Sequence, residues 1–266
     1  MSEKKQARAI WKGVVHAGTQ AVPVKLYSAV QDRSVHFRLL HKTDKSPVRQ
    51  QLVSSESGET VEYAEVRKAY PLDPGRLVVL EKEELEKLQP KESRDIEVTR
   101  FVDIGEIDHR WYERSYYLGP DGDSKGYFAV AAALEKKGKE GIARWVMRDK
   151  EYVGSLRAEQ GYLMLIVLRH ADEIISTSAL KAPSGRVLQK KELDMAEQLI
   201  QALHGEFDPT QFRDEYRDRV MDLVRTKAAG RKPKVVKFRP RAKETDDVTD
   251  ALAASLAGMK RKASRG

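Results

Sequence analysis

Two stretches decide the fold class of this 266-residue chain: Ala143-Arg-Trp-Val-Met147 and Gly161-Tyr-Leu-Met-Leu-Ile-Val-Leu-Arg169. Both are short and rich in aliphatic, β-branched or aromatic side chains, which is typical of strands. The apolar run at 162–168 is far below the roughly 20 residues that a membrane-spanning helix needs. Working outward, we predict about six to eight strands, the others at 21–27, 35–40, 77–80, 96–102 and 115–118.

Helical patterns between these strands are few, at 81–89 and 127–137. Strands at this spacing indicate a mainly β protein with an antiparallel barrel, rather than a doubly wound sheet. After Pro183-Ser184-Gly185 the apolar period becomes helical, which predicts a helix at 191–203 and a second that ends near Gly230. The start of the second helix is marked by Asp208 as its cap and by Pro209 in its first turn. Gln211 completes a capping box, and Phe207 and Phe212 are spaced as a hydrophobic staple.

Charge is distributed in blocks, although the chain has a net charge of +8. Residues 1–50 carry 10 basic and 3 acidic side chains, residues 51–180 carry 19 and 25, and residues 181–266 carry 20 and 13. The segment 225–243 holds nine Lys or Arg, no acid, and Gly230, Pro233 and Pro240. It is either a solvated linker or a mobile arm that contacts phosphates and releases counterions.

Composition and motifs favour a binding protein over an enzyme. The chain has no cysteine, which excludes disulfides, thiolate metal sites and cysteine nucleophiles. It has no phosphate-binding loop, dinucleotide fingerprint, His-Glu-x-x-His sequence or nucleophile elbow. A lysine Schiff base needs no motif, so an abasic-site lyase activity stays open. Without an apolar leader at the N-terminus, we expect a soluble intracellular protein with no signal peptide and no membrane partner.

Several segments together resemble the bacterial Ku family, in the family's order from about residue 8 to about residue 257. They are Ala9-Ile-Trp-Lys-Gly13, Pro23-Val-Lys-Leu-Tyr-Ser-Ala29, Phe37-Arg-Leu-Leu-His-Lys42, Val102-Asp-Ile-Gly-Glu-Ile-Asp108, Tyr116-Tyr-Leu-Gly-Pro-Asp121, Arg169-His-Ala-Asp-Glu-Ile174 and Glu192-Leu-Asp-Met-Ala196.

The resemblance implies a homodimer whose β-barrels and extended β-arms close a ring around double-stranded DNA ends. It also implies recruitment of a multifunctional ATP-dependent DNA ligase for non-homologous end joining, in the bacterial cytoplasm at the nucleoid. No metal or nucleotide cofactor is implied. Some relatives carry Cys-x-x-Cys-Gly where this chain has Ser54-Ser-Glu-Ser-Gly58, so we expect a metal-free hairpin over 48–61.

The DNA-binding residues that we predict are basic, because a ring that holds any sequence should contact phosphates rather than base edges. On the arm they are Arg33, Arg38, Lys42, Lys45, Arg49, Arg67 and Lys68. In the C-terminal basic segment they are Arg231, Lys232, Lys234, Lys237, Arg239 and Arg241. The acidic middle block is expected to face away from the duplex.

We expect four parts: a barrel with its arms (1–180), a helical region (181–230), a basic linker (231–243), and an amphipathic helix with a short basic tail (244–266). The last helix repeats apolar residues at about one turn and is the predicted ligase contact, through Val248, Leu252, Leu256 and Met259. It could instead fold back on its own protein. Among alternatives to the end-binding function, a sequence-specific DNA-binding regulator also stays open.

Overall fold

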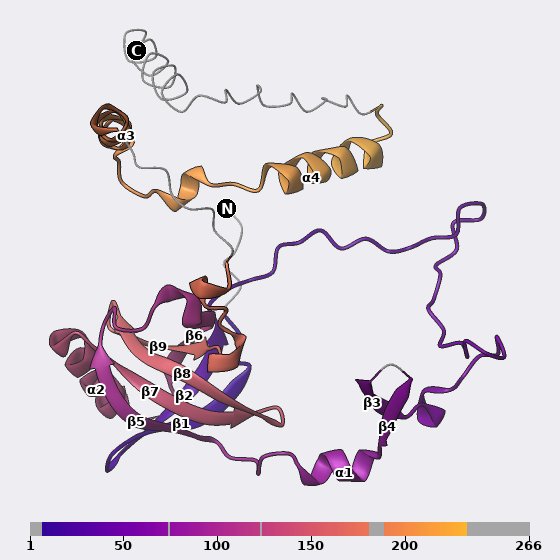
Figure 1. Ribbon diagram of the computed structural model, residues 1–266, viewed down its shortest axis with the longest axis horizontal. Helices are drawn as coiled ribbons and strands as arrows, with labels where there is room; N and C mark the ends of the chain where they lie inside the picture. Colours follow the sequence, from indigo (N-terminus) through magenta and orange to yellow (C-terminus); the bar gives the residue numbers. More distant parts are fainter. Residues whose placement is uncertain (1–6, 74, 123, 181–188, 233–266) are drawn as a thin grey trace. The chain divides into compact units, whose positions relative to one another are not determined.

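Seven of the strands form one closed barrel (Figure 1). The computed structural model describes residues 7–73, 75–122, 124–180 and 189–232. Around the barrel the strands follow the order β1-β2-β6-β9-β8-β7-β5. Their bounds are β1 Trp11–Ala17, β2 Gln20–Ser28, β5 Asp95–Asp103, β6 Tyr112–Pro120, β7 Lys139–Met147, β8 Lys150–Glu159 and β9 Tyr162–Leu168. The predicted mainly β barrel with helices is confirmed.

One pair of strands departs from the predicted antiparallel pattern. β1 runs parallel to β5, with Val15 opposite Ile96, and this pairing closes the barrel. All other neighbouring pairs in the barrel are antiparallel. Alternate side chains along the strands therefore point inward, and Val24, Leu26, Leu118, Leu163 and Leu165 are almost completely buried.

Helix α2 (Ser124–Lys137) contributes its apolar stripe to the same core. Tyr127, Ala131 and Leu134 are buried on one face of the helix, at the i, i+4, i+7 spacing. The helix ends at Gly138, whose φ of 59° is the left-handed conformation that terminates many helices. The prediction of a helix ending at this glycine is confirmed, and the helix begins three residues earlier than predicted.

A buried carboxylate lies within the barrel wall. Glu140 on β7 is fully buried and accepts hydrogen bonds from the hydroxyls of Tyr112, at 3.1 Å, and Ser155. The Nε of Arg157 lies 3.9 Å from the same carboxylate. Burial and the Glu140 carboxylate raise the pKa of the Tyr112 hydroxyl, so this phenol keeps its proton and remains a donor.

The 66 residues between β2 and β5 form an excursion from the barrel, which Figure 1 draws in indigo and purple. It holds three successive hairpins. The first is marked by a bridge between Leu40 and Pro47 and the second by a bridge between Val53 and Thr60. The third is the pair β3 (Lys68–Asp73) and β4 (Arg76–Leu80). The 3-10 turn Tyr63–Glu65 precedes β3, and helix α1 (Lys82–Lys87) follows β4.

Two sequence predictions for this excursion have different outcomes. The hairpin expected over 48–61 is confirmed, with backbone hydrogen bonds from Ser54 to Glu59 and from Val61 to Leu52. The strand predicted at 35–40 is wrong, because only Leu40 takes part in a bridge. The apolar residues that suggested it, Phe37 and Leu39, are about two-thirds exposed, so strand propensity alone did not supply a neighbouring strand.

The helical C-terminal part contains α3 (Lys190–Leu203) and α4 (Glu215–Ala228). The second helix was predicted to start at Asp208, and this is wrong. Asp208 instead caps the 3-10 turn Pro209–Gln211, and Asp214 caps α4 by accepting from the N–H of Arg217. The predicted staple is present, with the Phe207 and Phe212 rings stacked at 5.4 Å.

Contacts divide the chain into two compact units. One comprises residues 1–33 and 38–179, and the other residues 34–37 and 180–266. Three more 3-10 turns, His109–Trp111, Ala171–Glu173 and Thr177–Ala179, belong to the first. Among the helices of the described residues, none combines the length and the apolar character that a bilayer crossing requires.

Candidate nucleic-acid interface

Four of the predicted DNA-binding residues come together on the first hairpin of the excursion. The N–H of His41 donates to the carbonyl of Ser46 at 2.8 Å, and the N–H of Val48 donates to that of Leu39 at 3.2 Å. Arg38 and Arg49 flank the Leu40–Pro47 bridge, and Lys42 and Lys45 lie in the turn beyond it. All four side chains are exposed. The hairpin therefore gathers four exposed cations within a short stretch of chain.

The turn of this hairpin is fixed by its own polar groups. Lys45 has a φ of 61°, and its Nζ donates to the carbonyl of Lys42 at 2.7 Å. The Asp44 carboxylate accepts from the backbone N–H and the hydroxyl of Ser46, and it contacts His41 Nδ1 at 2.9 Å. These hydrogen bonds, those from Ser46 first, lower the pKa of Asp44, which keeps the carboxylate ionised. One negative charge thus lies beside the cations at the hairpin tip.

Charge separates sharply between the first and second hairpins. Residues 33–49 carry five basic side chains and one acidic side chain, whereas residues 50–66 carry four acidic and no basic side chains. The acids are Glu56, Glu59, Glu62 and Glu65, all exposed. A polyanion would be attracted by the first hairpin and repelled by the segment that follows it.

The remaining predicted residues of the arm lie elsewhere. Arg33 comes before the first hairpin, and its side chain is exposed. Arg67 pairs through Nε with Glu81 at 3.3 Å and donates to the carbonyl of Ala64, so part of its charge is balanced within the excursion. Lys68 opens β3 opposite Leu80 and is exposed. The structure thus brings four of the seven predicted cations of the arm into one hairpin.

Of the C-terminal predicted residues, only two lie in the described part of the chain. Arg231 and Lys232 follow α4 and are exposed. The other predicted DNA contacts, Lys234, Lys237, Arg239 and Arg241, lie outside the described residues. So do the predicted ligase contacts, Val248, Leu252, Leu256 and Met259.

Large apolar side chains are exposed along the same excursion. Tyr63 is 81% exposed and Leu77 is 66% exposed, in addition to Phe37 and Leu39. Isolated exposed apolar residues are common, but a succession of them along one segment is typical of interaction surfaces. Apolar periodicity in a sequence predicts burial but does not distinguish a core from an exposed interaction surface, so this surface could not be predicted.

One cluster of ion pairs connects β1 and β2 to the end of β6, within the segment 116–121 that resembles the family. Asp121, at the end of β6, pairs with Lys12 Nζ at 2.9 Å and Lys25 Nζ at 2.8 Å. Hydrogen bonds from Lys25 and then Lys12 lower the pKa of Asp121. Within the described ranges, His, Asp and Glu side chains form no group of three that could hold a metal ion.

A closed β-barrel that carries a long arm with a group of exposed cations defines a class of protein, in which a β scaffold offers a basic surface to a polyanion. Comparison with known proteins gives the family. The sequence model of the Ku70/Ku80 beta-barrel domain matches residues 17–195. The chain belongs to the Ku family.

Relatives match over nearly the whole chain. The protein is 39% identical over 96% of its length to the "Non-homologous end joining protein Ku" of Anaeromyxobacter sp. (strain K), covering 87% of that protein. It is 37% identical over 93% of its length to "Non-homologous end joining protein Ku 2" of Geotalea uraniireducens, covering 96% of that relative. The "Non-homologous end joining protein Ku" of Archaeoglobus fulgidus is 34% identical over 95% of this chain and is covered completely.

Proposed function

We propose that this protein binds double-stranded DNA ends without regard to sequence, as a homodimer that closes into a ring, during non-homologous end joining. The observation that carries the proposal is the first hairpin, which holds four exposed cations around the Leu40–Pro47 bridge: Arg38, Lys42, Lys45 and Arg49. Phosphate contacts of this kind give affinity without reading sequence. The names of the relatives support the assignment to end joining.

The second copy is needed to cover the arm. Phe37, Leu39, Tyr63 and Leu77 are each at least about two-thirds exposed, and burying such side chains stabilises an assembly by about 1.5–3 kcal/mol each. A symmetric dimer buries the same surface twice, once on each protomer. Two arms that cover each other would leave the first hairpins facing a common opening, through which a duplex passes.

The protein acts in this proposal by binding and recruitment, not by catalysis and without a cofactor. A closed ring can reach a duplex only at its ends, so topology rather than a chemical step provides specificity. The acidic second hairpin would face away from the duplex, as the charge separation of the arm requires. The partner that completes the repair reaction is the ATP-dependent DNA ligase, recruited by the segment 248–259.

The experiment compares one DNA in three forms: linear, covalently closed circular, and the same circle cut once. Mass measurement of the free protein accompanies the binding assay. We expect a dimer that binds the linear and cut forms, independent of sequence, and does not bind the closed circle. Equal retention on the closed circle, or a stable monomer, would refute the ring.

Two outcomes would replace the proposal with another function. A footprint confined to one sequence would identify a sequence-specific regulator. Covalent trapping of the protein on abasic DNA by borohydride would reveal a lysine-dependent lyase, because borohydride reduces the imine between a lysine and the sugar aldehyde to a stable amine.

The ligase contact is tested separately. Changing Leu252 and Leu256 to Asp places charges on the apolar stripe of the segment 248–259. We expect loss of ligase stimulation with unchanged binding of linear DNA. A matched control changes Ala254 and Ala257, which fall on the opposite side of a helix from the apolar positions, to Asp. Loss of DNA binding as well would assign the segment to the fold.

A further inference from the structure

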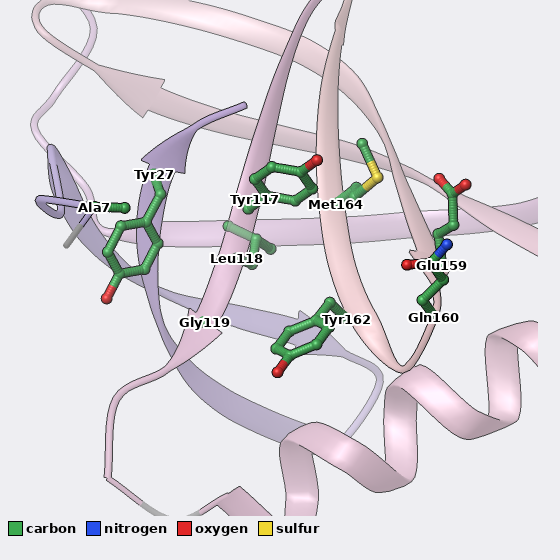
Figure 2. Close-up of a pocket in the computed structure, with 9 residues that line it drawn as sticks. All are labelled: Ala7, Tyr27, Tyr117, Leu118, Gly119, Glu159, Gln160, Tyr162 and Met164. Atoms are coloured by element: carbon green, nitrogen blue, oxygen red, sulfur yellow. The ribbon is translucent and has the colours of Figure 1, made fainter. Parts of the chain in front are cut away.

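A hollow lined by tyrosines lies on the outer surface of the barrel, across β2, β6 and β9 (Figure 2). Tyr27 on β2 is opposite Tyr117 on β6, and Tyr117 is opposite Met164 on β9. The three side chains therefore form one row across three strands. Their neighbours Leu26, Leu118 and Leu163 are buried in the barrel, so this row faces the other side of the sheet.

The floor of the hollow exists because position 119 has no side chain. Gly119 follows Tyr117 on the same face of β6. A Cβ atom at Gly119 would lie 3.1 Å from Cε2 of Tyr27, so any larger residue would push against that ring. Tyr162 forms another wall, and Figure 2 shows the Tyr27 and Tyr162 rings on either side of Gly119.

The tight turn between β8 and β9 forms another side of the hollow. Gln160 and Gly161 both have positive φ, 53° and 80°, which is the conformation of the hairpin turn that matches strand twist. This turn sets Glu159 directly opposite Tyr162. The Glu135 carboxylate on α2 accepts from the N–H of Gly161 at 2.8 Å and attaches the turn to the helix. The hollow is therefore built on strands and a fastened turn.

The charge of the hollow points to a cationic ligand. Of the nine lining residues only Glu159 carries a formal charge, and among the described residues no ion pair engages it. Tyr117 and Tyr162 are about half exposed, so their ring faces are accessible. Aromatic ring faces attract Lys and Arg side chains. Lys25, two residues before Tyr27, is already paired with Asp121.

We propose that this hollow binds an arginine or lysine side chain from an extended segment of a partner protein. The cation would lie against the tyrosine faces with Glu159 at its end. The volume of about 520 Å³ exceeds one side chain, so apolar neighbours in the segment would contact Met164 and Tyr27. A nucleic-acid strand is disfavoured, because Glu159 is the one charged residue of the lining and the two cations that border it are engaged. Lys25, opposite Gly119, pairs with Asp121, and Arg157, opposite Met164, lies 3.9 Å from the Glu140 carboxylate. The inference does not depend on ring formation or on DNA binding.

The test selects peptides from a random library on the full-length protein, with counter-selection on the double variant Tyr117→Ala/Tyr162→Ala. We expect the retained peptides to share an Arg or Lys among apolar residues. Their affinity is then measured by fluorescence anisotropy, with a fluorescein-labelled peptide and its norleucine-substituted form. Replacing the cation by norleucine should weaken binding about tenfold, as a cation–π contact of about 1.4 kcal/mol predicts.

Single variants separate recognition from folding. Tyr117→Ala should weaken peptide binding about tenfold, Tyr117→Phe should retain it, and Glu159→Gln should weaken it about two- to fivefold. The matched control is Tyr70→Ala, which removes a similarly exposed tyrosine from β3 and should change nothing. Equal loss with Tyr117→Phe would overturn the proposal.

Three other outcomes would also overturn it. Retained peptides without a common cation would exclude a cation site. Displacement of the peptide by single-stranded oligothymidylate, with the same dependence on Tyr117 and Tyr162, would assign the hollow to unpaired DNA. Self-association of the protein without peptide, abolished in the double variant, would assign it to a second copy of this chain.

Discussion

The hydroxyl of Tyr127 donates a hydrogen bond to the main-chain carbonyl of Leu118. The same oxygen accepts the N–H of Leu163 at 2.8 Å. Leu118 and Leu163 are register partners on β6 and β9, so the phenol stands between two strands at the point where their ladder ends. The ring is fully buried, and one side chain therefore connects α2, β6 and β9.

Tyr127→Phe should destabilise the barrel by about 1–3 kcal/mol, because two buried main-chain groups lose their partner while the ring remains. The measurement is the midpoint of urea unfolding at one fixed protein concentration. Tyr162→Phe, which removes an exposed hydroxyl, is the control and should leave the midpoint unchanged. Equal midpoints for Tyr127→Phe and the wild type would show that water replaces the hydroxyl.

Glu140→Ala should lower the free energy of unfolding by more, about 3–5 kcal/mol. The substitution removes the common acceptor of the Tyr112 and Ser155 hydroxyls and of the Arg157 guanidinium in the barrel wall. Glu97→Ala, on the exposed side of β5, should change stability little. Both are measured by urea unfolding. A small effect at Glu140 would mean that Arg157 turns to solvent and that water enters the cluster.

Acid should weaken the barrel partly through Asp121. Its pKa is lowered from 3.8 in the folded protein, so its contribution to stability is present above about pH 4 and is lost as the pH falls through the folded value. Asp121→Asn should be less stable than wild type at neutral pH, and the difference should shrink below pH 3.8. The exposed control Glu151→Gln should show no such convergence, and a constant difference at Asp121 would contradict the linkage.

The first hairpin should determine much of the salt dependence of DNA binding. Replacing Arg38, Lys42, Lys45 and Arg49 together by Gln should reduce the slope of log affinity against log salt by about 0.9 for each phosphate that the variant no longer neutralises. The control replaces Glu56, Glu59, Glu62 and Glu65 by Gln, which keeps the number of changes and should not reduce the slope. An unchanged slope in the basic variant would remove the hairpin from the interface.

The C-terminal basic segment should also contribute to the slope of log affinity for DNA against log salt concentration. Truncation after Gly230 removes Arg231, Lys232 and the basic residues beyond them while keeping α4, which ends at Ala228. We expect a shallower salt dependence than that of the full chain. Truncation after Lys243 keeps the basic segment and serves as the control. Equal slopes for the two truncations would leave the segment the role of a spacer between α4 and the last helix.

The elements that could be predicted from the sequence are those in which apolar side chains form a continuous run or recur at a regular helical spacing. The run at 162–168 is β9, and the pattern with Ala131 and Leu134 is α2. The prediction failed for strands that carry polar or small residues. β1 contains Lys12, Gly13 and His16, and β8 contains Gly154 and Ser155, and neither strand was predicted. Only pairing with distant strands makes these segments extended.

The candidate sites divide in the same way. Basic residues of the arm could be predicted from charge, but the hairpin that gathers four of them depends on the Leu40–Pro47 bridge, which a single sequence does not reveal. Buried Glu140 was not expected, because carboxylates are rarely buried without partners and its partners lie on other strands. The tyrosine hollow likewise needs the register of three strands, together with the absence of a side chain at Gly119.

The parallel pairing of β1 with β5 has a consequence for how such proteins can change over evolutionary time. β1 lies between the strand that the arm leaves and the strand to which it returns, so insertions in the arm need not disturb the registers on either side of β1. Doubling the length of a flexible loop costs only about 0.6 kcal/mol in closure entropy. The arm can therefore change in length at little energetic cost while the barrel keeps its strand registers.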